Sequence, residues 1–257
     1  MAGTYVLEAT ATPFGPARAA SEGAFAKVTV GTADVRDLTL KTSPNVAVTG
    51  RFRMESDHLR PPRPSQIHVG AYLAFDGMPL VSYAFAQDGS GGSFTLRGVH
   101  GPRVLRVGYV PATPLSPWWP WKVLLDGADI TDVPTDFSQA EHARLEVVFT
   151  QDPAGFMGTI ADQTGKPVPF AFAVIFSADR ALWHPWATTS NVVQADAEGT
   201  FGFPTRPGRY LAVALPPDAF LSSRDARPNF EQLSPKATPV QLGERERKVL
   251  SLRITGI

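Results

Sequence analysis

The chain has 257 residues, no cysteine, and 24 basic and 24 acidic side chains, so its formal net charge is zero. This length allows one or two domains with a sizeable core, and the lack of cysteine excludes disulfides and thiolate-zinc sites. The balanced charge argues against nucleic acid or an anionic membrane surface as the main partner.

No apolar stretch is long enough to span a bilayer, so we expect no membrane insertion. Residues 1–5 lack the basic and apolar segments of a signal peptide. The 22 glycines and 24 prolines are spread between short runs of β-branched residues. This pattern predicts an all-β chain with many turns between short strands.

Four short phrases recur along the chain at intervals of roughly 100 residues, the size of a sandwich domain. A glycine followed by an alternating strand occurs at residues 3–9, 101–107 and 208–214, and a closing strand occurs at 37–41, 144–149 and 249–254. An opening strand occurs only twice, at 46–51 and 154–159, and a glycine turn with a strand follows each at 91–96 and 198–203.

These repeats predict tandem Ig-like β-sandwich modules. We expect residues 1–43 to be the C-terminal strands of a truncated preceding module, residues 44–152 the first complete module and residues 153–257 the second. The simplest interpretation is a fragment of a longer array, because a half module exposes an unpaired sheet edge.

Local patterns agree with this organisation. The nearly all-apolar run at 170–176 predicts a strand buried on both faces, and residues 229–233, after a proline, predict a helical turn. Turns are expected at four dipeptides, Asp88-Gly89, Asp126-Gly127, Glu198-Gly199 and Leu242-Gly243, where a positive φ is needed.

The residues also resemble a known family. Residues 158–162, 165–169, 199–203 and 207–211, with 92–99 and 124–132 of the first unit, are similar to the carboxypeptidase regulatory-like domains of bacterial multi-module proteins. The resemblance implies a transthyretin-like sandwich, an extracytoplasmic location in an envelope or secreted protein, and no catalysis. The first unit departs from the pattern because residues 60–64 stand in place of the Gly-x-Pro-Val-Pro turn, so its long insert has no template.

Two tryptophan-rich segments are the candidate ligand-binding residues. They are Trp118, Trp119 and Trp121 in a predicted loop of the first unit, and Trp183 and Trp186 in a loop of the second. Exposed rings held stiff by prolines can stack on sugars or hold a peptide. The alternative is that the rings cap each sandwich or fill the junction between modules.

A metal site is the second candidate. His58 and His68 are the candidate histidine ligands, and Asp126 and Asp129 belong to an acidic run. Clustered carboxylates suit calcium, but the spacing is not that of an EF-hand loop, and a turn followed by a solvated strand end explains the run equally well. The histidines are not spaced like a zinc pair, so scattered surface histidines are the simpler interpretation, and we expect no cofactor.

The sequence therefore favours a non-catalytic binding or spacer module of a larger protein, which contacts carbohydrate or another protein through loop aromatics. The alternative is a hydrolase without a recognisable motif, esterase-like or metal-assisted, with a site built from loop His, Asp and Ser residues. Gly-x-Ser-x-Gly does not occur, and the candidate serines, Ser90, Ser93, Ser190 and Ser222, lie in expected turns or loops.

Overall fold

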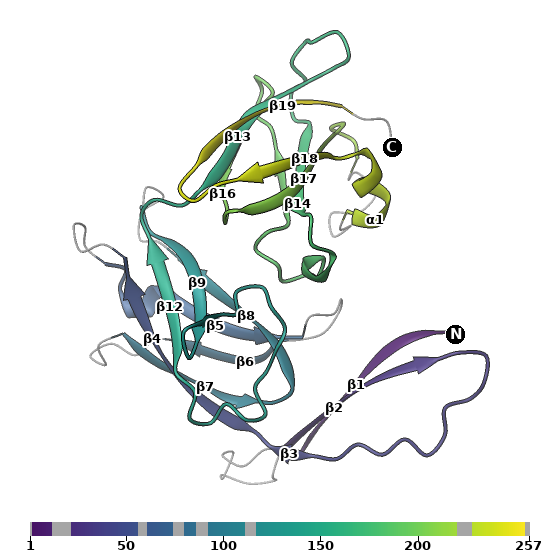
Figure 1. Cartoon of the computed structure of the whole chain (residues 1–257), viewed down its shortest axis with the longest axis vertical. Coiled ribbons are helices and arrows are strands. Elements are labelled where there is room, and N and C mark those ends of the chain that lie inside the picture. Colours follow the sequence, from purple (N-terminus) through teal and green to yellow (C-terminus); the bar gives the residue numbers. More distant parts are fainter. Residues whose placement is uncertain are drawn as a thin grey trace. The chain divides into compact units, whose positions relative to one another are not determined.

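The computed structural model describes residues 2–11, 22–55, 61–73, 80–85, 92–110, 117–219 and 228–254. The chain divides into two compact units, Met1–Thr150 and Gln151–Ile257. Strands dominate each unit (Figure 1), so the predicted all-β sandwich class is confirmed. Within the described ranges, no helix has the length and apolar character needed to cross a membrane.

The first unit holds a small N-terminal sheet and a sandwich of two sheets. The N-terminal sheet has the order β1-β2-β3, with β1 (Gly3–Ala11), β2 (Glu22–Val30) and β3 (Ser43–Pro44). One sandwich sheet has the order β10-β9-β12-β4-β7, with β4 (Val46–Met54), β7 (Ser93–Val99), β9 (Trp119–Leu125), β10 (Ala128–Asp129) and β12 (Leu145–Thr150). The other has the order β11-β8-β5-β6, with β5 (Ile67–Tyr72), β6 (Leu80–Phe85), β8 (Pro102–Tyr109) and β11 (Thr135–Asp136), and a 3₁₀ turn, η1 (Pro64–Gln66), precedes β5. Buried side chains of both sheets, among them Val48, Val69 and Leu145, form the core.

The second unit is a sandwich of a three-stranded and a four-stranded sheet. The first has the order β16-β13-β19, with β13 (Gly155–Ala161), β16 (Thr200–Pro204) and β19 (Arg247–Arg253). The second has the order β15-β14-β17-β18, with β14 (Phe172–Ser177), β15 (Asn191–Gln194), β17 (Gly208–Leu215) and β18 (Thr238–Leu242). Its core includes Phe156, Ile175 and Tyr210.

The four-stranded sheet of the second unit is covered on its outer face as well. A separate buried cluster includes Val174, Phe176 and Leu233, and Leu233 comes from the helix α1 (Phe230–Leu233). The 3₁₀ turns η2 (Arg180–Leu182) and η3 (Ser234–Lys236) flank this region. The prediction of a strand buried on both faces is therefore confirmed for β14, but not for Phe170, which lies outside the strand with a φ of 59° and is 51% exposed. The predicted helical turn after Pro228 is also confirmed. The N-cap of α1 is Asn229, whose side chain accepts a hydrogen bond from the Gln232 N–H.

The two sandwiches share one strand plan. In each, the opening strand lies between the closing strand and the glycine-turn strand: β12-β4-β7 corresponds to β19-β13-β16. The opposite sheets correspond as β11-β8-β5-β6 and β18-β17-β14-β15. The hairpin β9–β10, which extends the first sheet beyond β12, has no counterpart among the described residues of the second unit.

A parallel pairing between the opening and closing strands fixes the register in both sandwiches. Gly50 faces Leu145 across β4 and β12, and Gly158 faces Leu250 across β13 and β19. A Cβ atom on Gly158 would lie 1.9 Å from the carbonyl oxygen of Leu250, far inside van der Waals contact. Only glycine permits this approach, and a slip of one residue would turn every side chain to the other face.

Two strand expectations need correction. Residues 37–41 are not a strand: Asp37 has a φ of 57°, which breaks an extended conformation, and Leu38 is exposed. The Pro-rich segment around Trp119 is not a loop but part of β9, where Pro120 sits at a shift in register opposite Phe149. A bulge tolerates a proline because the missing N–H is not needed in the ladder there.

Among the expected turns, Asp126-Gly127 and Glu198-Gly199 do place a glycine at positive φ. The turn after Leu242 instead has its positive φ at Arg245, and Asp88-Gly89 lies outside the described residues. That residues 1–43 derive from a preceding module stays a prediction, although the phrases at 3–9, 101–107 and 208–214 all form strands.

The close approach at Gly158 predicts a large effect of a single methyl group. Gly158→Ala should lower the free energy of unfolding of the second sandwich by about 2 kcal/mol or more, because backbone must move to admit the Cβ. Gly202→Ala on the neighbouring strand is the control, since its Cβ would meet nothing closer than 3.7 Å, and it should stay within about 0.5 kcal/mol of the wild type. Urea unfolding measures both; equal effects would contradict the close-approach argument.

Candidate functional site

The tryptophans of the first unit are mostly internal. Trp118 is 4% exposed and Trp121 is 6% exposed, and Trp118 belongs to the core cluster. Trp119, between them on the sequence, is half-buried. Neither Trp118, which lies just before β9, nor Trp121 on β9 is exposed in the way that the predicted ligand platform requires.

The tryptophans of the second unit also take part in packing. The half-buried Trp183 donates from Nε1 to the Ser177 carbonyl at 2.7 Å, and its ring packs edge-on against Phe176 and Phe230. The Arg180 guanidinium lies 5.3 Å from the centre of the Trp183 ring. Trp186 is half-buried and its backbone N–H donates to a neighbouring histidine ring. Trp183 therefore helps to cover the four-stranded sheet.

The predicted metal ligands lie on separate elements. His68 is on β5, where its ring occupies the space that a Cβ on Gly108 would need, and burial lowers its pKa. Asp126 and Asp129 lie on the other sheet, at the β9–β10 hairpin. His58 lies outside the described residues. In the part of the chain that the structure describes, no three His, Cys, Asp or Glu side chains gather as a metal would require.

Both aspartates instead stabilise turns. Asp126 donates its backbone N–H to the Arg144 carbonyl and accepts the Arg144 N–H at Oδ1, both at 2.9 Å. Asp129 Oδ1 accepts the backbone N–H of Thr131 at 2.9 Å. These bonds are typical of aspartate in turns, and they agree with the alternative interpretation of the acidic run.

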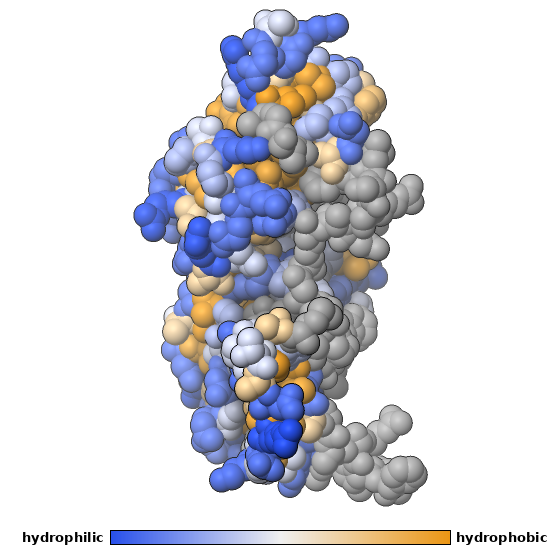
Figure 2. Space-filling model, turned by 90° about the vertical axis from the view of Figure 1, so that its right-hand side faces the viewer, coloured by the Kyte–Doolittle hydropathy of each residue, from blue (hydrophilic) through white to orange (hydrophobic). Residues whose placement is uncertain are grey.

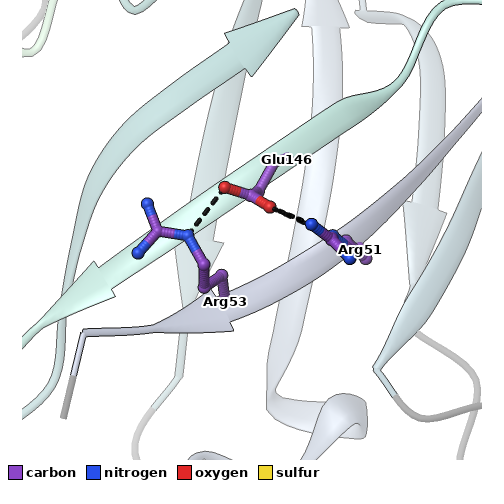
Figure 3. Close-up of polar contacts among 3 residues, drawn as sticks. All are labelled: Arg51, Arg53 and Glu146. Atoms are coloured by element: carbon purple, nitrogen blue, oxygen red, sulfur yellow. Dashed lines mark hydrogen bonds and ion pairs between the residues drawn. The ribbon is translucent and has the colours of Figure 1, made fainter. Parts of the chain in front are cut away.

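The strongest polar cluster in the first sandwich lies on the outer face of β4 and β12 (Figure 3). Glu146 accepts hydrogen bonds from Arg51 Nε and Nη2 at 3.0 and 2.8 Å, and from Arg53 Nε at 2.7 Å. The hydrogen bond from Arg53, followed by that from Arg51, lowers the pKa of Glu146, so this carboxylate is ionised at neutral pH. Both arginines are more than 40% exposed and keep further N–H groups on the solvent side.

Strand geometry places these three side chains together. Residues two apart on a strand share a face, so Arg51 and Arg53 point the same way. The parallel register then sets Glu146 directly beside Arg51, although the two lie 95 residues apart in sequence. The single carboxylate orients two guanidinium groups, which reduces the side-chain freedom that a ligand would otherwise have to restrict.

A groove of about 830 Å³ adjoins this cluster. The residues that line it are Thr49, Gly50 and Arg51 of β4, Ser93 of β7, Leu124 of β9, Leu145 and Glu146 of β12, the turn at Asp126 and Gly127, and the segment 141–144. Arg53 is bonded to Glu146 but does not itself line the groove. The paired hydrogen bonds between Asp126 and Arg144 hold this turn and this segment together. The groove thus combines charges of both signs with an apolar contact at Leu124.

The second sandwich provides an internal reference for this surface. Its equivalent positions follow from the shared register, in which Gly50 and Leu145 correspond to Gly158 and Leu250. By the same count Arg51, Arg53 and Glu146 correspond to Thr159, Ala161 and Ser251. The second sandwich therefore has the same strand arrangement without any of these three charged residues.

A second charged cluster is buried inside the first unit. Glu8 on β1 forms an ion pair with Arg103 on β8, and His100 Nε2 lies 3.0 Å from Glu8 Oε1. The side chains of Arg103 and His100 are 0% and 3% exposed, and the His100 ring packs against Gly23 of β2. This cluster ties the N-terminal sheet to the first sandwich; its members bond one another, so we treat it as structural.

Sequence reasoning missed the Arg51–Glu146–Arg53 cluster. Its members come from strands far apart in the chain, and each looks like an ordinary polar residue on a solvated strand face. The recurring opening and closing phrases were the only available signal, because aligning them pairs Arg51 with Thr159 and Glu146 with Ser251. Of the candidate serines, Ser93 is at the start of β7 and lines the groove, Ser190 precedes β15, and Ser90 and Ser222 lie outside the described residues.

No family model matches the chain, and no curated protein sequence matches it. Among similar solved structures, a Streptococcal ancillary pilin is 14% identical over 99% of this chain and 76% of its own, with a TM-score of 0.30. The Bacillus anthracis TIE protein is 13% identical over 98% of this chain, which spans only 43% of that chain, with a TM-score of 0.26. BcpA, the major pilin subunit of Bacillus cereus, is 9% identical over 81% of this chain and 99% of its own, with a TM-score of 0.27.

Likenesses at these scores do not place the chain in a family. The resemblance to carboxypeptidase regulatory-like domains therefore stays a prediction, and the function is inferred from the chain's own residues.

The buried histidine predicts a pH dependence of the first unit. Burial, and then the charge of Arg103, lowers the pKa of His100 from its ordinary value of 6.5. The negative charge of Glu8 opposes this shift. Asp136 on β11 also faces the cluster, and its charge raises the pKa of Arg103, which burial lowers. The pKa of His100 is therefore lower in the folded protein than in the unfolded chain. The neutral His100 ring then contributes fully to the free energy of unfolding above pH 6.5, and this contribution is lost as the pH falls below 6.5. Urea unfolding at pH 7.5 and at pH 5.5 should show a loss in the wild type that His100→Gln reduces. An equal loss in both proteins would assign the pH effect to other groups.

Proposed function

We propose that this chain is a non-catalytic binding module of a larger extracytoplasmic protein, and that the outer face of its first sandwich holds a polar segment of a partner protein. The extracytoplasmic setting comes from the sequence resemblance alone. The binding role comes from the groove beside Arg51, Arg53 and Glu146.

One observation carries the proposal: the second sandwich has the same strand plan with Thr159, Ala161 and Ser251 at the corresponding positions. Ion pairs between exposed side chains add little stability, so the fold gains little from this cluster. In contrast, the Arg51 guanidinium lines the groove with Leu124, and Glu146 orients it together with Arg53, an arrangement well suited to holding a carboxylate-bearing partner segment. The groove volume of about 830 Å³ falls in the range of ligand sites.

A protein partner is favoured over a sugar stacked on tryptophan. Trp118 and Trp121 are buried, and Trp183 is engaged by Ser177 and two phenylalanine rings. An aromatic platform would therefore depend on the half-buried Trp119 and Trp186 alone. The groove itself is lined by charged, polar and aliphatic residues.

The hydrolase alternative has one observation in its favour, since Ser93, Asp126 and His142 all line the groove. Asp126, however, already accepts the Arg144 N–H within its turn, and serine–histidine–aspartate chemistry needs the aspartate to orient the histidine. A panel of ester substrates tests this alternative: turnover that His142→Ala abolishes would replace the binding proposal with a catalytic one.

The second sandwich supplies the residues for the binding test. The triple variant R51T/R53A/E146S gives the first sandwich the residues of the second, so it should fold with wild-type stability. A photo-crosslinking residue in place of Thr95, on the outer face of β7, should form an adduct with a partner protein on intact producing cells. We expect the triple variant to reduce that adduct at least tenfold.

The control carries the same crosslinker in place of Thr159, on the matching face of the second sandwich. Mass spectrometry of the adduct maps the contact on both chains. An undiminished adduct in the triple variant would refute the assignment of the groove, and an adduct made of glycan would favour the carbohydrate alternative.

A further inference from the structure

The two closing strands differ in what lies beside them. In the first sandwich β12 pairs with β4 on one side and with the antiparallel strand β9 on the other. In the second, β19 pairs with β13 on one side, and among the described residues its other side meets only an isolated bridge between Ile254 and Ala214 of β17. That bridge lies just beyond the strand, so no described strand pairs with the outer side of the stretch from Arg247 to Leu252, which forms an edge of the described sheet.

Hydrogen bonds show which backbone groups face this edge. The Glu246 carbonyl accepts from Gly155, and the Ile254 N–H donates to Ala161, so even-numbered residues of β19 bond to β13. In a parallel pair the intervening residues point the other way, so the backbone groups of Val249 and Ser251 face outward. The counterpart of Val249 in the first sandwich is Arg144, whose carbonyl accepts the backbone N–H of Asp126 in the β9–β10 hairpin.

Burial along the two closing strands differs in the same direction. Leu145 and Val147 of β12 are 1% and 0% exposed, whereas their counterparts Leu250 and Leu252 on β19 are 9% and 8% exposed. Hydrophobic side chains do reach the surface of this protein in patches (Figure 2), and Val249, at 70%, is the most exposed large hydrophobic residue that the structure describes. The core residues of the second sandwich are therefore slightly more exposed along β19 than those of the first sandwich along β12, which β9 covers.

We propose that the edge of β19 receives an antiparallel strand from a partner protein, in the place that β9 occupies in the first sandwich. The strand supplies apolar side chains next to Leu250 and Leu252, as Leu125 and Val123 do for Leu145 and Val147. Its backbone bonds to the outward groups of Val249 and Ser251, a mode of recognition that exposed sheet edges commonly support.

The basic residues of β19 indicate which kind of partner strand this edge would bind. The edge carries Arg247 and Arg253; Arg253 Nη1 donates to the Gln163 carbonyl at 3.3 Å, and Lys248 beside them is paired with Glu246 at 3.1 Å. An antiparallel β19 from a second copy, paired in the two-fold register centred on Leu250, would bring Arg247 of one chain toward Arg253 of the other, and like charges across a strand pair are destabilising. The occupant is therefore a different strand, with a carboxylate opposite Arg253, where the first sandwich has Lys122 opposite Val148.

A peptide taken from this chain is the probe. It repeats Trp119–Leu125 with Lys122→Glu, so that the carboxylate falls opposite Arg253, and its comparison peptide keeps the lysine. NMR titration of the full chain should shift the amide signals of β19, and the Glu peptide should bind at least threefold more tightly than the Lys peptide. This comparison needs no variant of the protein. Equal affinity, or no shift in β19 with either peptide, would overturn the proposal.

Two variants at one position test the backbone contact. Ser251→Pro removes an outward N–H without touching the bonds to β13, and an edge strand tolerates proline on that side. It should weaken binding of the Glu peptide at least tenfold, whereas Ser251→Ala should stay within twofold of the wild type. The triple variant R51T/R53A/E146S should bind the peptide normally, which separates this edge from the groove. A concentration-dependent dimer that Ser251→Pro dissociates would make a second copy the occupant and overturn the proposal.

Discussion

The parallel pairing of the opening and closing strands is the constraint on which each sandwich depends. Gly50 against Leu145 and Gly158 against Leu250 set two backbones side by side, and the second contact leaves no room for a Cβ atom. This pairing brings together chain segments that are about a module apart in sequence. Once it is set, the alternation of each strand decides which side chains enter the core and which face solvent.

The two sandwiches therefore share a strand arrangement but have different surfaces. The outer face of the first sandwich bears two arginines around a single carboxylate. The matching face of the second has Thr159, Ala161 and Ser251 at those three positions, and elsewhere it bears Val249 with Arg247 and Arg253. The edges differ as well, because β9 pairs with the closing strand of the first sandwich, whereas no described strand takes that place beside β19. The two sandwiches thus share a strand plan and differ in the residues of their outer faces and edges.

Much of the fold can be predicted from the sequence because the signals are local. The recurring phrases, the apolar run before Ser177 and the turn glycines depend on periodicity and backbone conformation, and the structure agrees with most of them. The alternating pattern at residues 37–41 predicted a strand wrongly, because Asp37 has a left-handed backbone conformation. The prolines around Trp119 indicated a loop, whereas the structure has a bulged strand there. The groove could not be predicted, because Arg51 and Glu146 become neighbours only through a register between distant strands.

The direction of the strand pairs has a mechanical consequence. The chain enters each sandwich at the start of the opening strand and leaves it at the end of the closing strand, and these two strands run parallel. Tension along the polypeptide would therefore pull the two strands past each other lengthwise, loading their ladder of hydrogen bonds all at once instead of one after another. A module built in this way resists stretching at its own ends, a property that suits a chain connecting neighbouring parts of a larger assembly.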